Sequence, residues 1–221
     1  MMYKYSTLLL LAFFLSVKSF SQQHAFQDEI DAFKKLDAEK MPPSKAILFT
    51  GSSSFRLWTD VKDYFPGYTI INRGIGGSTL PDLIYFYKDA ILPYRPRQIL
   101  IYCGENDFAA SDTVTVETVV TRFKQLYFMI RKDYKKIPLA YVAMKPSPSR
   151  QHLMPKYVLA NTAIAKFLKN QKNTSFIDVY KNMLAPDGNP MNDIFKNDNL
   201  HMNAKGYAIW QRIIQPYLLK D

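Results

Sequence analysis

The feature that most constrains the fold is an alternation between short apolar runs and longer segments with helical spacing. Five runs rich in apolar and β-branched residues are each typical of a buried strand, at positions 46–51, 68–75, 98–104, 139–144 and 175–180. Helical spacing of apolar residues is clearest in Val116–Lys136, Tyr157–Asn170 and Ala204–Leu219. The alternation predicts an α/β fold in which a five-stranded parallel sheet is covered by helices on both faces.

The beginning of the chain has the pattern of a secretory signal peptide. Lys4 precedes an unbroken apolar run, Leu8–Leu15, which is followed by the small-residue site Ser19–Ser21. A membrane anchor is the alternative, but eight apolar residues are far fewer than the roughly 20 needed to cross a bilayer. We therefore expect residues 1–21 to be removed near Gln22, and the protein to be exported to the periplasm or beyond.

The remaining residues 22–221 are expected to form a single domain. A chain of 221 residues with 48% hydrophobic content can bury one well-packed core, but not two of ordinary size. Cys103 is the only cysteine, so no internal disulfide can form even in an oxidising compartment.

The basic charge is scattered along the chain. The net charge is +10, and it falls to +8 once Lys4 and Lys18 are removed with the signal peptide. Basic and acidic residues are mixed in stretches such as "KKLDAEK" and "RKDYKK". This pattern favours a solvated surface over a nucleic-acid interface. We expect neither a nucleic-acid partner nor stable membrane insertion.

Three polar clusters follow the first three predicted strands. They are "GSSS" at 51–54, "GIGGST" at 74–79 and "GEND" at 104–107. In parallel sheets, active sites form at the edge where the strands end. The clusters are therefore predicted to converge on one rim, and one of the three serines at 52–54 is a candidate nucleophile.

Several other kinds of site do not fit these clusters. "GIGGST" has neither the lysine nor the length of a phosphate-binding P-loop, and Thr79 stands where a dinucleotide-binding fingerprint has its last glycine. "GSSSF" lacks the closing glycine of a G-x-S-x-G nucleophile elbow. No two histidines or cysteines have the spacing of metal ligands. We expect no metal and no other cofactor.

A serine nucleophile needs a base, and the chain has three histidines. His24 lies near the predicted mature N-terminus, and His152 lies in a polar stretch without a neighbouring carboxylate. His201 follows Asp198 by three residues, and positions i and i+3 share a face on a helical turn. Asp198 could orient the imidazole for catalysis, or the two residues could merely cap the last helix.

Four blocks together resemble the SGNH hydrolase (GDSL-like lipase/acylhydrolase) family in order and position. They are Gly51-Ser52-Ser53, "NRGIGGST", "GEND" and "DNLHMNAKGY", and the resemblance extends from about Ala46 to Tyr217. It implies a three-layer α/β/α flavodoxin-like fold and ester hydrolysis without a cofactor.

The resemblance also implies a role for each matching residue. Ser53 occupies the nucleophile position, and its own backbone N–H gives one oxyanion contact. Gly77 matches the glycine whose N–H gives a second contact, and Asn106 matches the side-chain amide that gives the third. Asp198 and His201 match the acid and the base. Glycine permits a close backbone approach and asparagine offers a neutral donor, so both residue types suit these roles.

The neighbours of the nucleophile have expected roles of their own. The family usually has aspartate where this chain has Ser52. We expect one of Ser52 and Ser54 to bond backbone groups and the other to cap the first helical turn. Phe55 and Trp58 are expected to pack beneath this loop.

Two arginines are candidates for contact with a substrate. Arg73 could stabilise a substrate or form a salt bridge, and Arg150 lies in the loop after the fourth predicted strand, where the rim should be.

The function that fits best is a serine esterase acting on a small-molecule or glycan ester. Small acyl groups such as acetyl on carbohydrate are favoured because no long apolar lid segment is visible. Three alternatives remain: a lysophospholipase-like acylhydrolase, an acyltransferase, and a non-catalytic glycan-binding envelope protein on the same scaffold.

Overall fold

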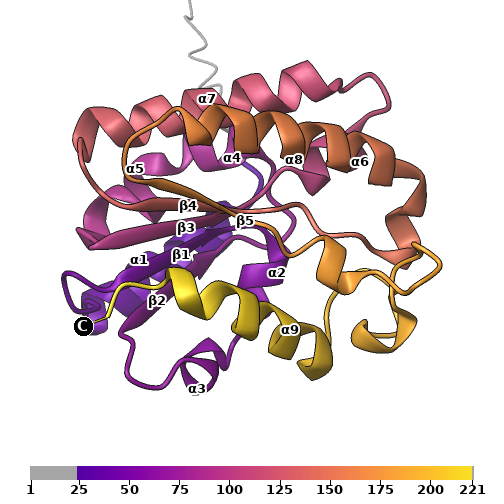
Figure 1. Cartoon of the computed structure of the whole chain (residues 1–221). Helices are drawn as coiled ribbons and strands as arrows, with labels where there is room; N and C mark the ends of the chain where they lie inside the picture. Colours follow the sequence, from indigo (N-terminus) through magenta and orange to yellow (C-terminus); the bar gives the residue numbers. More distant parts are fainter. Residues whose placement is uncertain (1–23, 221) are drawn as a thin grey trace, which may run out of the picture.

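The centre of the molecule is a five-stranded parallel sheet. The computed structural model describes residues 24–220 and orders the strands β2-β1-β3-β4-β5 (Figure 1). The strands are β1 (Ile47–Gly51), β2 (Ile70–Gly74), β3 (Gln98–Tyr102), β4 (Leu139–Val142) and β5 (Thr174–Ile177). The first four lie within the predicted apolar runs and β5 begins one residue before its run, so the predicted parallel α/β sheet is confirmed.

Helices cover both faces of the sheet. In Figure 1, α4, α5, α7 and α8 lie on one side, and α2, α3 and α9 lie on the other. Their bounds, together with those of α1 and α6, are α1 (Gln27–Glu39), α2 (Ser53–Arg56), α3 (Val61–Tyr64), α4 (Leu80–Tyr85), α5 (Tyr87–Ala90), α6 (Glu105–Ala110), α7 (Val116–Asp133), α8 (Met154–Lys169) and α9 (Ala204–Ile214). Short 3₁₀ turns include η1 (Leu92–Tyr94), η2 (Pro148–Leu153) and η5 (Gln215–Tyr217).

Each face of the sheet has its own hydrophobic core, because alternate residues of a strand point to opposite faces. On β3, Ile99 and Ile101 pack among the α1, α4, α5, α7 and α8 side chains, whereas Leu100 packs on the α2 and α9 side. There the rings of Trp58 and Tyr207 stack at 4.7 Å, and Phe55 is fully buried. The predicted packing of Phe55 and Trp58 beneath the loop after β1 is confirmed.

The last helix is shorter than its apolar pattern predicted. α9 ends at Ile214 and a 3₁₀ turn follows, because Pro216 has no N–H to continue the helical bonds. The side chain of Gln98 then fixes the end of the chain to the start of β3. It donates to the carbonyl of Tyr217 (2.7 Å) and accepts from the N–H of Leu219 (2.9 Å).

The predicted signal peptide, residues 1–21, lies outside the described residues. Within residues 24–220, no helix has both the length and the apolar character required to cross a bilayer.

Candidate active site

A continuous chain of hydrogen bonds joins Ser53, His201 and Asp198. The Nε2 of His201 lies 3.0 Å from the Oγ of Ser53, and its Nδ1 lies 2.7 Å from Oδ2 of Asp198. Ser53 is the first residue of α2, directly beyond the carboxyl end of β1. The three residues therefore have the relative placement of a nucleophile, a base and an orienting carboxylate.

Asp198 and His201 lie in a tight turn that precedes α9. The turn is closed by a bond from the N–H of Lys196 to the carbonyl of His201 (2.8 Å). The Oδ1 of Asp198 accepts bonds from the N–H groups of Leu200 and His201, each at 2.9 Å. The cap of α9 is Asn203, whose side chain accepts two backbone bonds. Asp198 and His201 therefore do not serve as the cap of the last helix.

The carboxylate of Asp198 is stabilised in its charged form. Burial works to raise its pKa, but hydrogen bonds from the backbone and ring of His201 and from the backbone of Leu200 outweigh this effect. The pKa of Asp198 is lowered to about 2. Asp198 is thus ionised at neutral pH and can accept a hydrogen bond from a proton-bearing Nδ1 of His201; in that tautomer Nε2 is free to accept a proton from Ser53.

The three consecutive serines have different surroundings. Ser53 is partly exposed, whereas Ser52 and Ser54 are buried. Ser52 is the N-cap residue of α2 but makes no side-chain cap bond. Its hydroxyl instead accepts a bond from the side-chain amide of Asn106 (2.7 Å), while the carbonyl of Ser54 accepts from the hydroxyl of Tyr207 (2.9 Å). The expectation that one of Ser52 and Ser54 caps this helix is therefore wrong: Ser52 is the N-cap residue, and its hydroxyl is engaged by the Asn106 amide instead.

Three candidate oxyanion donors lie around Ser53. Gly77 has a φ of 82°, a left-handed conformation that favours glycine, and its N–H has no hydrogen-bond partner within residues 24–220. The N–H of Ser53 is at the start of α2, where helical geometry leaves amides unpaired. Asn106 differs, because its Nδ2 already donates to Ser52 and to the carbonyl of Ser78 (3.0 Å). An oxyanion can bond Asn106 only by sharing one of these hydrogens.

A pocket of about 430 Å³ contains four of the five predicted site residues. Its lining residues are Glu29, Ser53, Arg56, Leu57, Gly76, Gly77, Asn106, Arg150, Leu200 and His201. Asp198 lies behind His201. The polar clusters after the first three strands thus meet at one rim, as the sequence predicted.

The two candidate arginines have different positions. Arg150 lines the pocket, and its loop is attached to the loop of the base by a bond from the N–H of Ser149 to the carbonyl of Asn199 (3.0 Å). Arg73 is not in the pocket. It pairs with Asp37 and donates to the hydroxyl of Tyr94 (2.7 Å), so it forms a structural salt bridge.

Sequence reasoning missed several charged residues at the site. Glu29, from α1, and Arg56, from α2, are paired at 3.1 Å on the pocket wall. Behind Arg150, the buried ammonium of Lys145 lies 3.4 Å from the carboxylate of Glu105. Burial lowers the pKa of Lys145, whereas the charge of Glu105 acts to raise it. Glu105 lies within the "GEND" block, but no role was predicted for it, and no motif marks Glu29, Arg56 or Lys145.

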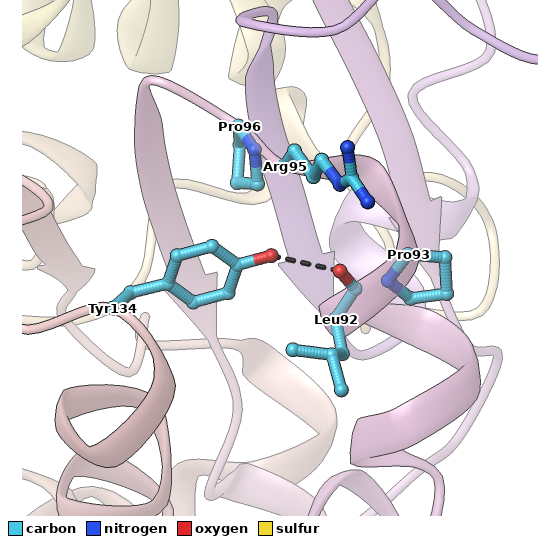
Figure 2. Close-up of a pocket in the computed structure, with 5 residues that line it drawn as sticks. All are labelled: Leu92, Pro93, Arg95, Pro96 and Tyr134. Atoms are coloured by element: carbon cyan, nitrogen blue, oxygen red, sulfur yellow. Dashed lines mark hydrogen bonds between the residues drawn. The ribbon is translucent and has the colours of Figure 1, made fainter.

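A second hollow, of about 610 Å³, lies at the opposite edge of the sheet. It is formed by residues that precede β3 and β4, and Figure 2 shows the hydroxyl of Tyr134 pointing toward the carbonyl of Leu92, at 2.7 Å. Its other lining residues are Pro93, Arg95 and Pro96. Its lining includes no serine, histidine or carboxylate, so it lacks the set of side chains found in the pocket around Ser53.

Comparisons with known proteins agree with this fold. Solved structures with the same fold include a protein from Streptococcus pneumonia (TM-score 0.76, 20% identity, covering 88% of this chain and 93% of that one). A GDSL-like lipase from Bacteroides thetaiotaomicron has a TM-score of 0.70 at 18% identity, with coverage of 85% and 95%. An acetylxylan esterase from Geobacillus stearothermophilus has a TM-score of 0.61 at 14% identity, with coverage of 82% and 97%.

Among curated protein sequences, none matches this chain. Residues 49–209 match the model of the GDSL-like Lipase/Acylhydrolase family, a span that includes all five predicted site residues. This chain therefore belongs to the GDSL-like lipase/acylhydrolase family of ester-hydrolysing enzymes.

Proposed function

We propose that the protein is a cofactor-independent serine esterase whose nucleophile is Ser53. The observation that carries this proposal is the position of His201, whose two ring nitrogens lie 3.0 Å from Ser53 and 2.7 Å from Asp198. A base held between a hydroxyl and a carboxylate can remove the proton from the hydroxyl while the carboxylate stabilises the resulting imidazolium.

The reaction proceeds through an acyl-enzyme. The Oγ of Ser53 attacks the ester carbonyl while Nε2 of His201 takes its proton, which gives a tetrahedral oxyanion. The oxyanion collapses, the alcohol leaves with the proton from His201, and the acyl group stays on Ser53. Water, deprotonated by the same imidazole, then attacks the acyl-enzyme and releases the carboxylic acid.

The oxyanion is stabilised by donors that are in place before the reaction. The N–H groups of Gly77 and Ser53 supply two bonds, and Asn106 supplies a third by sharing a hydrogen with one of its present partners. Removing one such donor from a comparable site lowers kcat by about 10²–10³-fold.

The proposed substrate is a small acyl group, such as acetyl, on a carbohydrate. The pocket is modest in volume, and three of its lining side chains, Glu29, Arg56 and Arg150, are charged. Such a wall favours an alcohol rich in hydroxyl groups over a long acyl chain. Acetylxylan esterases are also among the solved structures that share this fold. We propose that Arg150 contacts the alcohol part of the substrate.

The experiment compares ester substrates of increasing chain length. Purified residues 22–221 are assayed with p-nitrophenyl acetate, butyrate and octanoate, and then with acetylated xylo-oligosaccharides and a lysophospholipid. We expect kcat/KM to be highest for acetate, with release of acetate from the oligosaccharide. A preference for octanoate and the lysophospholipid would instead support a lipid acylhydrolase, and transfer of acetyl to an added sugar would indicate an acyltransferase.

The nucleophile is identified by covalent labelling. A fluorophosphonate should modify Ser53, as determined by peptide mapping, and Ser53→Ala should abolish both labelling and turnover while keeping the wild-type melting temperature. Dialysis against EDTA should leave activity unchanged. An adduct on Ser52, Ser54 or Ser78 contradicts the assignment, and so does a loss of activity that added zinc restores.

A further inference from the structure

A side chain from the N-terminal helix reaches the loop that carries the proposed oxyanion donor. Glu29 lies on α1, and its carboxylate accepts the N–H of Gly76 at 3.2 Å through Oε1 and 3.1 Å through Oε2. Oε2 also accepts from Nε of Arg56 at 3.1 Å. Arg56 is the last residue of α2, the short helix that begins at Ser53. One carboxylate therefore links the loop that contains Gly76 and Gly77 to the helix that begins at the nucleophile.

The loop is anchored on both sides of its tip. Before the tip, the N–H of Ile75 bonds the carbonyl of Gly51 (2.7 Å). After it, the hydroxyl of Ser78 bonds the same carbonyl (3.2 Å). The tip itself is Gly76-Gly77. These two residues have no side chains. A bond from the N–H of Ser78 to the carbonyl of Ile75 (3.3 Å) closes the turn across them, and the bonds from Gly76 to Glu29 attach the tip to α1.

The fit between α1 and this tip is close. A Cβ at Gly76 would lie 2.9 Å from Oε1 of Glu29. Any residue other than glycine at position 76 would therefore displace the Glu29 carboxylate or the loop. The ring of Phe26, just before α1, lies 3.7 Å from the position of a Cβ at Gly77. Phe26 and Glu29 therefore cover the tip from one side, and α1 lies outside the span 49–209 that matches the family.

We propose that Glu29 is a positioning residue for the oxyanion donor Gly77. Its bond to Gly76 fixes the orientation of the adjoining peptide, and hence the direction of the Gly77 N–H, before an ester binds. The Arg56 guanidinium neutralises the Glu29 carboxylate, so that this negative charge does not repel the developing oxyanion. This inference rests on the proposed esterase function, because it assigns Glu29 a part in the same transition state.

The test compares three variants, Glu29→Ala, Glu29→Gln and Glu39→Ala. Glu29→Ala removes the acceptor for Gly76. Glu29→Gln keeps a side-chain oxygen that can accept this bond. Glu39→Ala is the matched control, because it removes the same charge from the exposed last residue of the same helix. Each is assayed with p-nitrophenyl acetate, and its melting temperature is measured.

We expect Glu29→Ala to lower kcat by about 10–100-fold with little change in KM, because a misplaced donor weakens only the transition state. Glu29→Gln should restore most of kcat, and Glu39→Ala should match the wild type. The affinity of Glu29→Ala for a small alkylboronic acid, which forms a tetrahedral adduct with the nucleophile, should fall in parallel with kcat. The melting temperature should change equally little in Glu29→Ala and Glu39→Ala.

Failure of this inference and failure of the esterase function give different results. If the wild type does not hydrolyse p-nitrophenyl acetate or any of the longer esters, the esterase function is wrong. If the wild type is active and Glu29→Ala keeps its kcat and its boronate affinity, Glu29 does not position the oxyanion donor. A rise in KM alone, or a loss of kcat explained by a lower melting temperature, also overturns this inference.

Discussion

The side-chain amide of Asn106 donates to the hydroxyl of Ser52 across 2.7 Å, so the residue before the proposed nucleophile restrains a proposed oxyanion donor. The same amide donates to the carbonyl of Ser78 at 3.0 Å. Ser52 stands where the family usually has aspartate. A neutral hydroxyl accepts this bond more weakly than a carboxylate would, so the hydrogen directed at Ser52 is easier to share with a developing oxyanion.

Ser52→Ala should therefore have a small effect on turnover. Asn106 keeps its bond to Ser78, so we expect kcat to stay within about tenfold of the wild type, whereas Asn106→Ala should lose about 10²–10³-fold. The free energy of unfolding should fall by about 1 kcal/mol in Ser52→Ala, as is typical for one lost hydrogen bond. Steady-state kinetics and chemical denaturation measure the two effects. An equal loss of kcat in the two variants would contradict this view of Ser52.

Asp198→Asn should reduce turnover without unfolding the protein. An amide at this position can present an N–H to the imidazole and so favour the wrong tautomer, and in a well-studied triad this change costs about 10⁴-fold in kcat. His201→Ala should be at least as damaging, because it removes the base. Circular dichroism provides the folding control. Wild-type kcat in either variant would refute the proposed triad.

The low pKa of Asp198 predicts how its contribution depends on pH. Its ordinary value of 3.8 is lowered to about 2 by hydrogen bonds from His201 and Leu200, which outweigh the opposing effect of burial. A lowered pKa in the fold means that the ionised carboxylate stabilises the native state above pH 3.8, and that this contribution disappears as the pH falls through about 2. Activity lost on moderate acidification is then not due to protonation of Asp198.

Carbon-13 NMR of the Asp198 carboxyl group measures this titration directly. The difference in stability between the wild type and Asp198→Asn should also shrink as the pH falls from 3.8 toward 2. A carboxyl group that titrates above 3.8 would show that the hydrogen bonds from the turn do not hold it in its charged form.

Export is proposed from the sequence alone. Mass spectrometry of protein from the native host should find a mature N-terminus near Gln22. Recovery of a chain that still begins at Met1 would contradict processing by a signal peptidase.

The strands were predictable because each is a short apolar run between polar segments. Residues such as Ile47 and Ile99 are completely buried, and their type alone indicates this. The end of α9 was less predictable, because the apolar spacing continues beyond the point where Pro216 removes a helical donor. Periodicity thus identifies an element more reliably than it gives its boundary.

The candidate site also has one part that could be predicted from the sequence and another that could not. Ser53, Gly77, Asn106, Asp198 and His201 stand in short motifs with recognisable spacing, and the fold brings them to one rim. The contact of Glu29 with Gly76 could not be predicted, since the two residues are 47 positions apart and neither position implies the other. The hydrogen bonds of the Asn106 amide to Ser52 and Ser78 could not be predicted from the sequence either, because they depend on how the fold brings these residues together.

The hydrogen bond between Ser53 and His201 joins positions 148 residues apart. The nucleophile follows the first strand and the base lies in the turn before the last helix, so a ribosome-bound chain that lacks its final residues has no working pair. The loop of His201 is held by turns and by one isolated antiparallel bridge, Phe195–Met202, and not by the central sheet, so we expect it to open more easily than the sheet. During gradual denaturation, hydrolysis should disappear before the β-sheet signal does, so catalysis reports on the integrity of the C-terminal region and not on the fold as a whole.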